Sequence, residues 1–485
     1  MKNIFKFLLI PIFLISCDDY LERSPLDQPS SNTFWSSEGE LLMAVNGCYS
    51  TLSYIRTGPL PFFMLFDAMA DIGWHRSATS VTPIRMGTVT AGDPELLDIW
   101  KTLYEGVSSC NLLLENMHRA EEKVNPQLFA RIAAEAKFLR AFYYFYLNEL
   151  WGGVPLITTS LPLSESQTPR ATKEELVDFM IQELQEAAED LPLSYSGIDK
   201  GRVTKGTALG LLSRVALQNK RWDIAANAAK QVIDSKVYKL VPNYLELFYY
   251  SHQDSEEVML SQRFHRGSQV HTLPRRIGSR NGGGTSEFIV QLALVDSYLC
   301  VDGLPIDKSP LYDPANPHLN RDPRLNYTVV MPGTLHWGYQ FETHIDSVQC
   351  WDYNVTPARR IENQDVTNPF AGFSGVLIRK YADPADRFDN SNSTLNFILM
   401  RYAEILLNYA EAKIEKNEID KSVYDALNEI RSRESVNMPL ITEGKSQEEM
   451  RSILRIERKS ELALEGLRFF DIRRWGIAES VMPGY

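Results

Sequence analysis

One stretch of this 485-residue chain, residues 125–155, constrains its fold more than any other. Asn125 and Pro126 predict a helix start, since an Asn side chain caps the first amides and proline has no N–H to leave unbonded there. Gly152 and Gly153, with Pro155 just beyond, predict its end. Two apolar stripes run along it, Leu128, Ile132, Leu139, Tyr143, Tyr146 and Leu150 on one and Phe129, Ala133, Ala136, Phe138, Phe142 and Phe145 on the other. A helix with two apolar faces packs between other helices, so we expect a mainly α fold around it.

Apolar residues at helical spacing predict further helices on both sides of this one. Their expected ranges are 36–52, 94–117, 173–191, 204–219, 222–235, 396–416 and 421–435. Residues 204–219 and 222–235 form one helical hairpin, and residues 396–416 and 421–435 form another. Both hairpins resemble degenerate tetratricopeptide units. Because the two hairpins are far apart, we expect a tetratricopeptide-like helical framework interrupted by another segment. Residues 60–94 show no regular pattern.

The interrupting segment is expected at about residues 262–393. Helical periodicity fades there, and Gly, Pro, Asn and Asp recur closely, as in Asn281-Gly282-Gly283-Gly284. A long irregular segment inside a compact domain is usually functional. We therefore expect one domain over residues 36–485, with its helical framework at about 36–261 and 394–476 and a loop-rich ligand-binding insertion between them.

Aromatic side chains gather in this insertion and supply candidate ligand contacts. The cluster comprises His336, Trp337, Tyr339, Phe341, Trp351 and Tyr353. Aromatic faces stack on the C–H faces of sugar rings, while polar neighbours bind the hydroxyls. Large aromatics are often buried, so we expect about half of the six to hold loops on the core, and Trp74 has the same alternative role. The candidate ligand-binding residues are Trp74, His75, Arg76, His336, Trp337, Tyr339, Trp351 and Tyr353.

Residues 1–16 are predicted to be a lipoprotein signal peptide. Lys2 and Lys6 flank the start of an apolar run that is too short for a bilayer core of ~30 Å, which needs roughly 20 residues. Leu14-Ile15-Ser16-Cys17 looks like a lipobox, so we expect Cys17 to be lipidated, with an ordinary secretory leader as the alternative. Residues 17–35 then form a lipidated tether, in which Asp18-Asp19 resemble the acidic tags that send some lipoproteins to the cell exterior.

Several blocks along the chain resemble one known family. They are Lys137–Phe145 with Leu150–Leu156, Leu294–Tyr298 with Asp302–Ile306, Asn320–Leu325, Ile378–Tyr381, Met400–Ala412 and Ile456–Gly476. Together they are similar to the RagB/SusD family of nutrient-uptake outer-membrane lipoproteins. The resemblance implies a SusD-like helical fold and a surface protein that captures a nutrient, mostly a glycan, for a SusC-like TonB-dependent transporter. It implies no catalysis and no cofactor.

The same blocks place charged residues among apolar stripes. Pairs at helical spacing include Arg401–Glu404, Arg458–Glu461, Glu465–Arg468 and Asp471–Arg474, and the central helix adds Arg131–Glu135. Because unpaired buried charges are heavily penalised, we interpret these residues as ion pairs that hold helices in register. The interpretation covers Arg401, Glu404, Glu411, Arg458, Glu461 and Arg468, and it is favoured over a catalytic carboxylate pair.

The sequence gives little support to other chemistry. A formal net charge of −12 without a basic block argues against nucleic acid as a partner. The chain contains no G-x-S-x-G, H-E-x-x-H, Walker or Rossmann pattern. The residues Asp383, Asp386, Asp389 and Asn392 could surround Ca²⁺, but without the EF-hand Gly and Glu a solvated acidic loop is favoured and no metal site is expected. Buried free thiols are expected at Cys48, Cys110, Cys300 and Cys350, although four cysteines also permit three disulfide pairings.

The sequence therefore favours a lipid-anchored outer-membrane protein that faces the exterior. It would bind an oligosaccharide or another small nutrient and deliver it to a SusC-like TonB-dependent transporter. Two alternatives stay open. A glycoside hydrolase requires two carboxylates ~5 to ~9.5 Å apart in a cleft. A protein-interaction scaffold of the transporter would bind no sugar.

Overall fold

The computed structural model describes residues 34–54, 56–57, 60–76, 81–162, 164 and 167–482. Over these residues the chain is mainly α-helical, as the periodicity predicted. The signal peptide, Cys17 and nearly all of the tether lie outside the described residues. Among the helices of the described part, none is both long and apolar enough to cross a bilayer.

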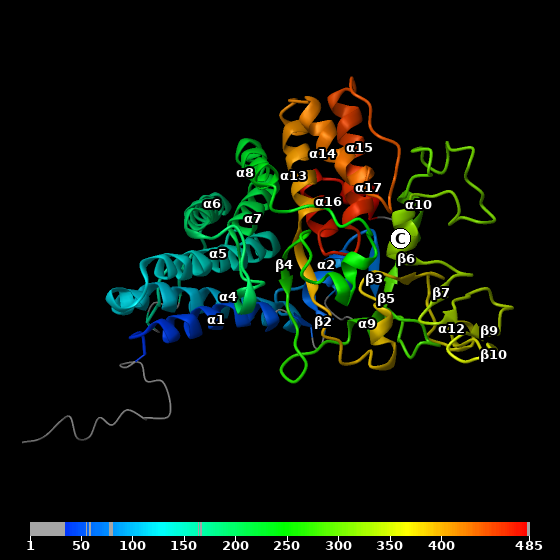
Figure 1. Ribbon diagram of the computed structural model, residues 1–485, viewed down its shortest axis with the longest axis horizontal. Helices are drawn as coiled ribbons and strands as arrows, with labels where there is room; N and C mark the ends of the chain where they lie inside the picture. The colour runs from blue at the N-terminus through cyan, green and yellow to red at the C-terminus, as the bar shows by residue number, and fades with distance from the viewer. Residues whose placement is uncertain are drawn as a thin grey trace, which may run out of the picture.

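The first group of helices forms a stack along the N-terminal half of the chain. Its members are α1 (Glu38–Tyr54), α4 (Pro94–Asn116), α5 (Pro126–Trp151), α6 (Lys173–Asp190), α7 (Lys205–Gln218) and α8 (Trp222–Ser235). From α4 onward each helix packs against the next, and α1 packs on α4. Helix α8 also packs on α13 (Tyr402–Glu415), which belongs to the second group. Figure 1 shows α1, α4 and α5 lying side by side, with α6, α7 and α8 above them.

Helix α5 lies inside this stack and has the ends that the sequence predicted. Asn125 Oδ1 accepts hydrogen bonds from the backbone N–H groups of Gln127 and Leu128, at 2.9 and 3.3 Å. Gly152 ends the helix with a φ of 74°, a conformation that glycine adopts without strain. Every residue from Phe138 to Glu149 is buried, so both apolar faces are covered by neighbours. The predicted Arg131–Glu135 ion pair is present at 3.2 Å.

The second group of helices comes from the C-terminal part of the chain. It contains α13 (Tyr402–Glu415), α14 (Lys421–Arg431), α15 (Gln447–Leu462), α16 (Arg468–Trp475) and α17 (Ala478–Val481). The helix expected from residue 396 starts later, because Phe397–Arg401 form strand β12, which pairs antiparallel with β4 (Val258–Gln262). All five residues of β12 are buried, and an apolar run covered on both sides has no period that separates strand from helix.

Residues 60–94, which show no pattern in the sequence, nevertheless contain regular elements. These are β2 (Leu60–Pro61), which pairs with β1 (Arg56–Thr57), then α2 (Phe62–Ala68), β3 (Gly73–His75) and α3 (Val81–Arg85). Every residue of α2 is buried. A short helix covered on all sides carries no polar face, so it shows no amphipathic period.

The segment between β4 and β12 contains many short elements joined by loops. They are α9 (Leu273–Ile277), β5 (Phe288–Val290), α10 (Leu292–Ser297), α11 (Pro323–Thr328), β6 (Val329–Val330), β7 (Leu335–His336), β8 (Tyr339–Gln340), β9 (Gln349–Asp352), β10 (Arg359–Glu362), α12 (Gln364–Thr367) and β11 (Leu377–Ile378). Strands β7 to β10 form an antiparallel sheet, β6 pairs with β11, and β5 pairs with β3. Short 3-10 helices occur at Met117–Lys123, Gly197–Asp199, Glu246–Phe248, Tyr250–His252 and Pro384–Phe388.

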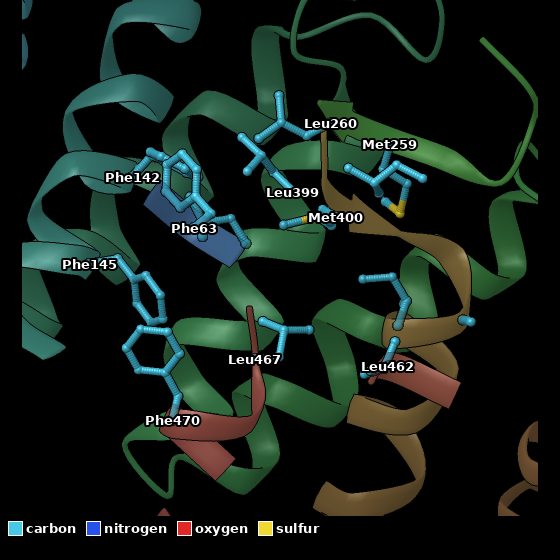
Figure 2. Packing of buried hydrophobic residues seen from close by; sticks show 14 of the residues in the cluster. Phe63, Phe142, Phe145, Met259, Leu260, Leu399, Met400, Leu462, Leu467 and Phe470 are labelled. Carbon is cyan, nitrogen blue, oxygen red and sulfur yellow. The ribbon is translucent and has the colours of Figure 1, made fainter. Parts of the chain in front are cut away.

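One hydrophobic core joins the helical groups to this segment. Figure 2 shows Phe63 of α2 near Phe142 of α5, and Phe145 of α5 facing Phe470 of α16. The ring centroids are 6.1 Å apart in the first pair and 6.0 Å apart in the second. Aromatic rings from three distant parts of the sequence therefore meet on the central helix.

The charged residues interpreted as structural ion pairs are indeed buried and paired, but mostly with distant partners. Arg401 pairs with Glu257, Glu461 and Glu465, Glu404 with Arg214, Glu411 with Arg474, Arg458 with Asp471, and Arg468 with Asp71. Asp471 and Arg474 do pair at the expected spacing, at 2.9 Å. The expected pairings Arg401–Glu404, Arg458–Glu461 and Glu465–Arg468 are wrong, because these side chains point into the core, where other elements supply the partner.

Candidate ligand-binding site

The aromatic residues predicted in the 336–353 region divide by burial. Trp337 is only 5% exposed, and its Nε1 donates a hydrogen bond to the carbonyl oxygen of Ala382 at 3.2 Å. Its ring packs so closely on Gly278 and Gly282 that a Cβ at either position would lie within 2.8 Å of it. His336 is buried beside it, with ring centroids 4.7 Å apart. The expected roles of His336 and Trp337 as ligand contacts are therefore not supported, because both rings hold the loops on the core.

Trp351 and Tyr353 are exposed, by contrast, and form what we call the hairpin platform together with Arg359 and Arg360. Strand β9 alternates exposed and buried residues, which turns Trp351 outward and Cys350 and Asp352 inward. Trp351 and Tyr353 are 37% and 50% exposed. Their ring centroids lie 6.2 Å apart, and the ring planes are inclined by 33°. The pair thus presents an accessible aromatic surface.

The neighbouring strand braces this platform. Arg360 of β10 lies opposite Trp351, and its guanidinium carbon is 5.4 Å from the ring centroid of that tryptophan. Arg359 lies opposite the buried Asp352 and pairs with it at 3.3 Å. Tyr339 of β8 is partly buried and also lies opposite Asp352. The sheet therefore holds the exposed rings on a backbone that is hydrogen-bonded on both sides.

A second exposed aromatic group, which we call the loop-aromatic cluster, consists of Trp74, Arg76, Arg280, Phe370 and Phe373. Phe370 and Phe373 are 60% and 59% exposed. The Trp74 ring meets Phe373 edge to face at 6.2 Å, and the Arg76 guanidinium carbon is 5.4 and 5.7 Å from the two phenyl centroids. Sequence reasoning found Trp74 and Arg76 but missed the other three members. Two phenylalanines within the run Asn368-Pro369-Phe370-Ala371-Gly372-Phe373 were the available signal, since a loop of this composition seldom needs large apolar residues.

His75, the third candidate from this region, points away from the cluster. Strand geometry turns it to the opposite side of β3 from Trp74 and Arg76. It is 3% exposed and packs edge to face on Phe288 at 6.1 Å. Burial lowers the pKa of His75 to about 4, so the imidazole is neutral at physiological pH. Its expected role as a polar ligand contact is not supported.

The two exposed groups are held by neighbouring segments. Asn281 Nδ2 donates to the carbonyl oxygen of Glu362, the last residue of β10, at 2.8 Å. The backbone N–H of Arg280 donates to Asp365 in α12, also at 2.8 Å. Figure 1 shows β9, β10 and α12 together at one end of the molecule. The chain from β9 through Phe373 therefore carries most of the exposed aromatic surface.

Two partly open hollows of the described part lie elsewhere, on the helical framework. One hollow of about 360 Å³ is lined by residues that include Tyr195, Lys200, Arg202 and Tyr238. Another, of about 420 Å³, lies between α6, α7 and α8. The exposed aromatic groups are open surfaces, which suit an extended ligand better than a small enclosed one.

The groups considered for other chemistry are mostly engaged within the protein. Asp383 accepts the backbone N–H of Tyr250, and Asp386 accepts the hydroxyls of Tyr250 and Ser393. No group of three or more His, Cys, Asp or Glu side chains in the described part is placed to hold a metal ion. The four cysteines at positions 48, 110, 300 and 350 are buried free thiols, as expected.

Comparisons with known proteins agree on one family. Residues 248–485 match the model described as "SusD family", and residues 19–217 match the model described as "Starch-binding associating with outer membrane". SusD-like protein P25 of Formosa agariphila is 25% identical over 99% of this chain and 91% of its own length.

Solved structures show the same fold. A SusD-like carbohydrate binding protein from Bacteroides fragilis is 29% identical and aligns with a TM-score of 0.81 over 93% of this chain and 91% of its own. A laminarin binding SusD-like protein aligns with a TM-score of 0.73 over 93% and 94% of the two chains, at 21% identity. Similarity therefore extends along nearly the whole length of both chains.

Proposed function

This chain belongs to the RagB/SusD family, and from that premise we propose that it is a lipid-anchored protein of the outer membrane that binds an oligosaccharide at the cell exterior and delivers it to a SusC-like TonB-dependent transporter. The observation that carries the ligand part of this proposal is the exposed Trp351–Tyr353 pair on β9. We assign Trp351 and Tyr353 as stacking residues, with Tyr339 at their edge.

Sugar rings have apolar C–H faces and polar edges. Two accessible rings inclined by 33° offer a shallow curved surface on which such faces stack. The neighbouring Arg359 and Arg360 supply N–H donors for ring hydroxyls. Because the platform is open, it accepts an internal stretch of a polymer as readily as an end.

The family supports the location and the class of ligand. One of the two matching models is described by its association with the outer membrane, and relatives include proteins described as carbohydrate binding and laminarin binding. The lipid anchor at Cys17, the exterior orientation and the transporter are part of the proposal. The family is one of glycan-binding proteins, and we propose that this member likewise has no catalytic activity.

Binding to a glycan panel tests the ligand part. We expect isothermal titration of the purified mature protein to find a bound oligosaccharide, and the double variant Trp351→Ala/Tyr353→Ala to bind it at least tenfold more weakly. Phe388→Ala is the matched control, since Phe388 is 82% exposed but lies outside both aromatic groups. Equal affinity of the double variant and the wild type would overturn the assignment of these rings.

Two further readouts separate the alternatives. Cleaved oligosaccharide after long incubation would identify a hydrolase. Silence across the panel, with the transporter still co-purifying from outer membranes, would indicate a scaffold that binds no sugar. Binding without cleavage, together with co-purification, is the expected result.

A further inference from the structure

Two arginines in the loop-aromatic cluster converge on a single carbonyl oxygen. Arg76 Nη1 donates to the carbonyl oxygen of Phe370 at 2.8 Å. Arg280 donates to the same oxygen through Nε at 3.0 Å and through Nη2 at 2.5 Å. Arg76 Nη2 is held by the carbonyl oxygen of Thr285 at 3.0 Å. The backbone carbonyl of Phe370 thus holds two guanidinium groups close together, and that of Arg76 also lies 5.4 Å from the Phe370 ring centroid.

This arrangement differs from that of the arginines of the helical framework. The framework arginines Arg214, Arg324, Arg401, Arg433, Arg458 and Arg468 each pair with at least one carboxylate. Within the described residues, neither Arg76 nor Arg280 forms an ion pair with a carboxylate. A carbonyl oxygen carries only a partial negative charge, so most of the positive charge at this point is left uncompensated.

The nearest carboxyl groups are already engaged. Asp365 accepts the backbone N–H of Arg280, and Glu287 pairs with Arg276. Burial and, after it, the neighbouring charge of Arg76 lower the pKa of Arg280, although the guanidinium stays protonated at any physiological pH. The charges of Glu287 and Asp365 act on Arg280 in the opposite direction, but neither forms an ion pair with its guanidinium. The cluster therefore keeps positive charge that an anion from outside the chain would neutralise.

The cluster also offers free N–H donors and an apolar surface to a ligand that carries an anionic group. Each guanidinium has five N–H donors in a planar fork, and those at Arg280 Nη1 have no hydrogen-bond partner among the described residues. Phe370 and Phe373, each about 60% exposed, stand beside the arginines, with Trp74 at the edge of Phe373. A ligand with an apolar face and an anionic group at its edge would contact both features.

We propose that the loop-aromatic cluster is a subsite for an acidic sugar unit, whose ring packs on Phe370 and Phe373 while its carboxylate or sulfate group binds Arg76 and Arg280. This inference rests on the proposed function and narrows its ligand class from glycans in general to anionic glycans. The hairpin platform agrees with it, since Arg360 lies on Trp351 and the side chain of Arg359 is 65% exposed. Guanidinium forks match planar carboxylate oxygens and sulfate oxygens alike, so both anions are included.

Matched pairs of oligosaccharides test the proposal. The probes are galacturonate oligomers against their carboxyl-reduced forms, and sulfated galactan oligomers against their desulfated forms. We expect the wild type to bind at least one anionic member at least tenfold more tightly than its neutral counterpart, with the difference shrinking as salt is raised. Preference within the first pair identifies a carboxylate ligand, and preference within the second a sulfate ligand.

Variants then locate the preference. Arg280→Gln and Arg76→Gln are each expected to lower the anionic-to-neutral affinity ratio at least fivefold, while Arg280→Lys, which keeps the charge without the planar fork, falls between them and the wild type. Arg221→Gln, at the residue before α8, is the matched control, because it removes an exposed arginine of the helical framework that belongs to neither aromatic group. Thermal melting of each variant establishes that it is folded, and either glutamine variant suffices if the other does not fold.

Each outcome decides between the two proposals. Equal binding of anionic and neutral partners by the wild type, or an unchanged ratio in a folded glutamine variant, would overturn the acidic-sugar subsite and leave the glycan-binding function standing. Absence of binding to every member of both pairs and of the wider panel would overturn both.

Discussion

Arg401, the last residue of β12, donates through Nη1 to Oε1 of Glu461 in α15 at 2.8 Å and through Nη2 to the backbone carbonyl oxygen of the same residue at 2.7 Å. The two residues are 60 positions apart and essentially inaccessible to solvent. Glu461 also accepts hydrogen bonds from Arg324 and Arg433, at 2.9 and 2.8 Å. One carboxylate therefore joins three arginines from β12, α11 and the end of the second helical hairpin.

Replacing this carboxylate should destabilise the protein strongly. Although burial raises it, the guanidiniums of Arg433, Arg401 and Arg324 hold the pKa of Glu461 well below its usual range. Glu461→Gln would leave these cations partly uncompensated inside the core, and we expect it to lower the free energy of unfolding by about 3 to 5 kcal/mol in urea denaturation. Asp425→Asn, which breaks the exposed Lys421–Asp425 pair, is the control and should cost far less, because an exposed ion pair contributes little to stability. A loss below about 1 kcal/mol for Glu461→Gln would contradict this account.

His271 should make the protein sensitive to mild acid. Its Nδ1 accepts the backbone N–H of Leu273 at 3.2 Å, so its Nε2 carries the proton and donates to the carbonyl oxygen of Leu395 at 2.7 Å. Burial lowers the pKa of His271 to about 4, against an unfolded value near 6.5. The unfolded chain therefore takes up a proton at a higher pH than the folded one, and stability present above pH 6.5 is lost as the pH falls toward 4.

The expected size of this loss is about 3 kcal/mol from His271 alone, since each pKa unit corresponds to ~1.4 kcal/mol. Urea denaturation at steps between pH 7 and 4.5 measures it. His271→Asn should reduce the slope of the pH dependence, to which the buried His75 and His336 also contribute, while lowering stability at pH 7. The same change at the exposed His265 is the control. An unchanged slope in His271→Asn would show that other groups cause the acid sensitivity.

Removing the two tryptophans of the 336–353 region should cost very different amounts of stability. Trp337→Ala would open a cavity against Gly278 and Gly282, and we expect a loss of about 3 to 5 kcal/mol. Trp351→Ala removes a ring that is 37% exposed and should cost about 1 kcal/mol or less. Chemical denaturation compares them directly. Similar losses for both would mean that the hairpin platform is a structural element and not an open surface.

Two helical glycines provide a test of the packing of α4 on α5. A Cβ at Gly106 would lie 2.5 Å from the ring of Tyr143, which is itself buried. Gly106→Ala should therefore destabilise the protein by about 1 to 3 kcal/mol. At Gly47, an exposed position in α1, a Cβ would meet no described atom within 4 Å, so Gly47→Ala should stabilise by up to about 1 kcal/mol. Thermal melting should shift in opposite directions for the two variants.

The sequence alone determined what depends on neighbours along the chain. The cap at Asn125, the end at Gly152 and the two apolar faces of α5 follow from spacing within one helix, and the structure has all three. The prediction that the buried charged residues form ion pairs followed from the high cost of burying an unpaired charge. The stretches that resemble the RagB/SusD family extended the prediction from single helices to the whole fold.

Only the tertiary structure decided which residues meet. It paired Arg401 with Glu257, Glu461 and Glu465 in place of Glu404, because buried side chains point across to other elements. It also buried Trp337 and exposed Trp351, two tryptophans in the same sequence region, since exposure depends on what packs against each side of a short sheet. The Arg76–Arg280 convergence on Phe370 joins three separate segments, and no local spacing encodes a contact of that kind.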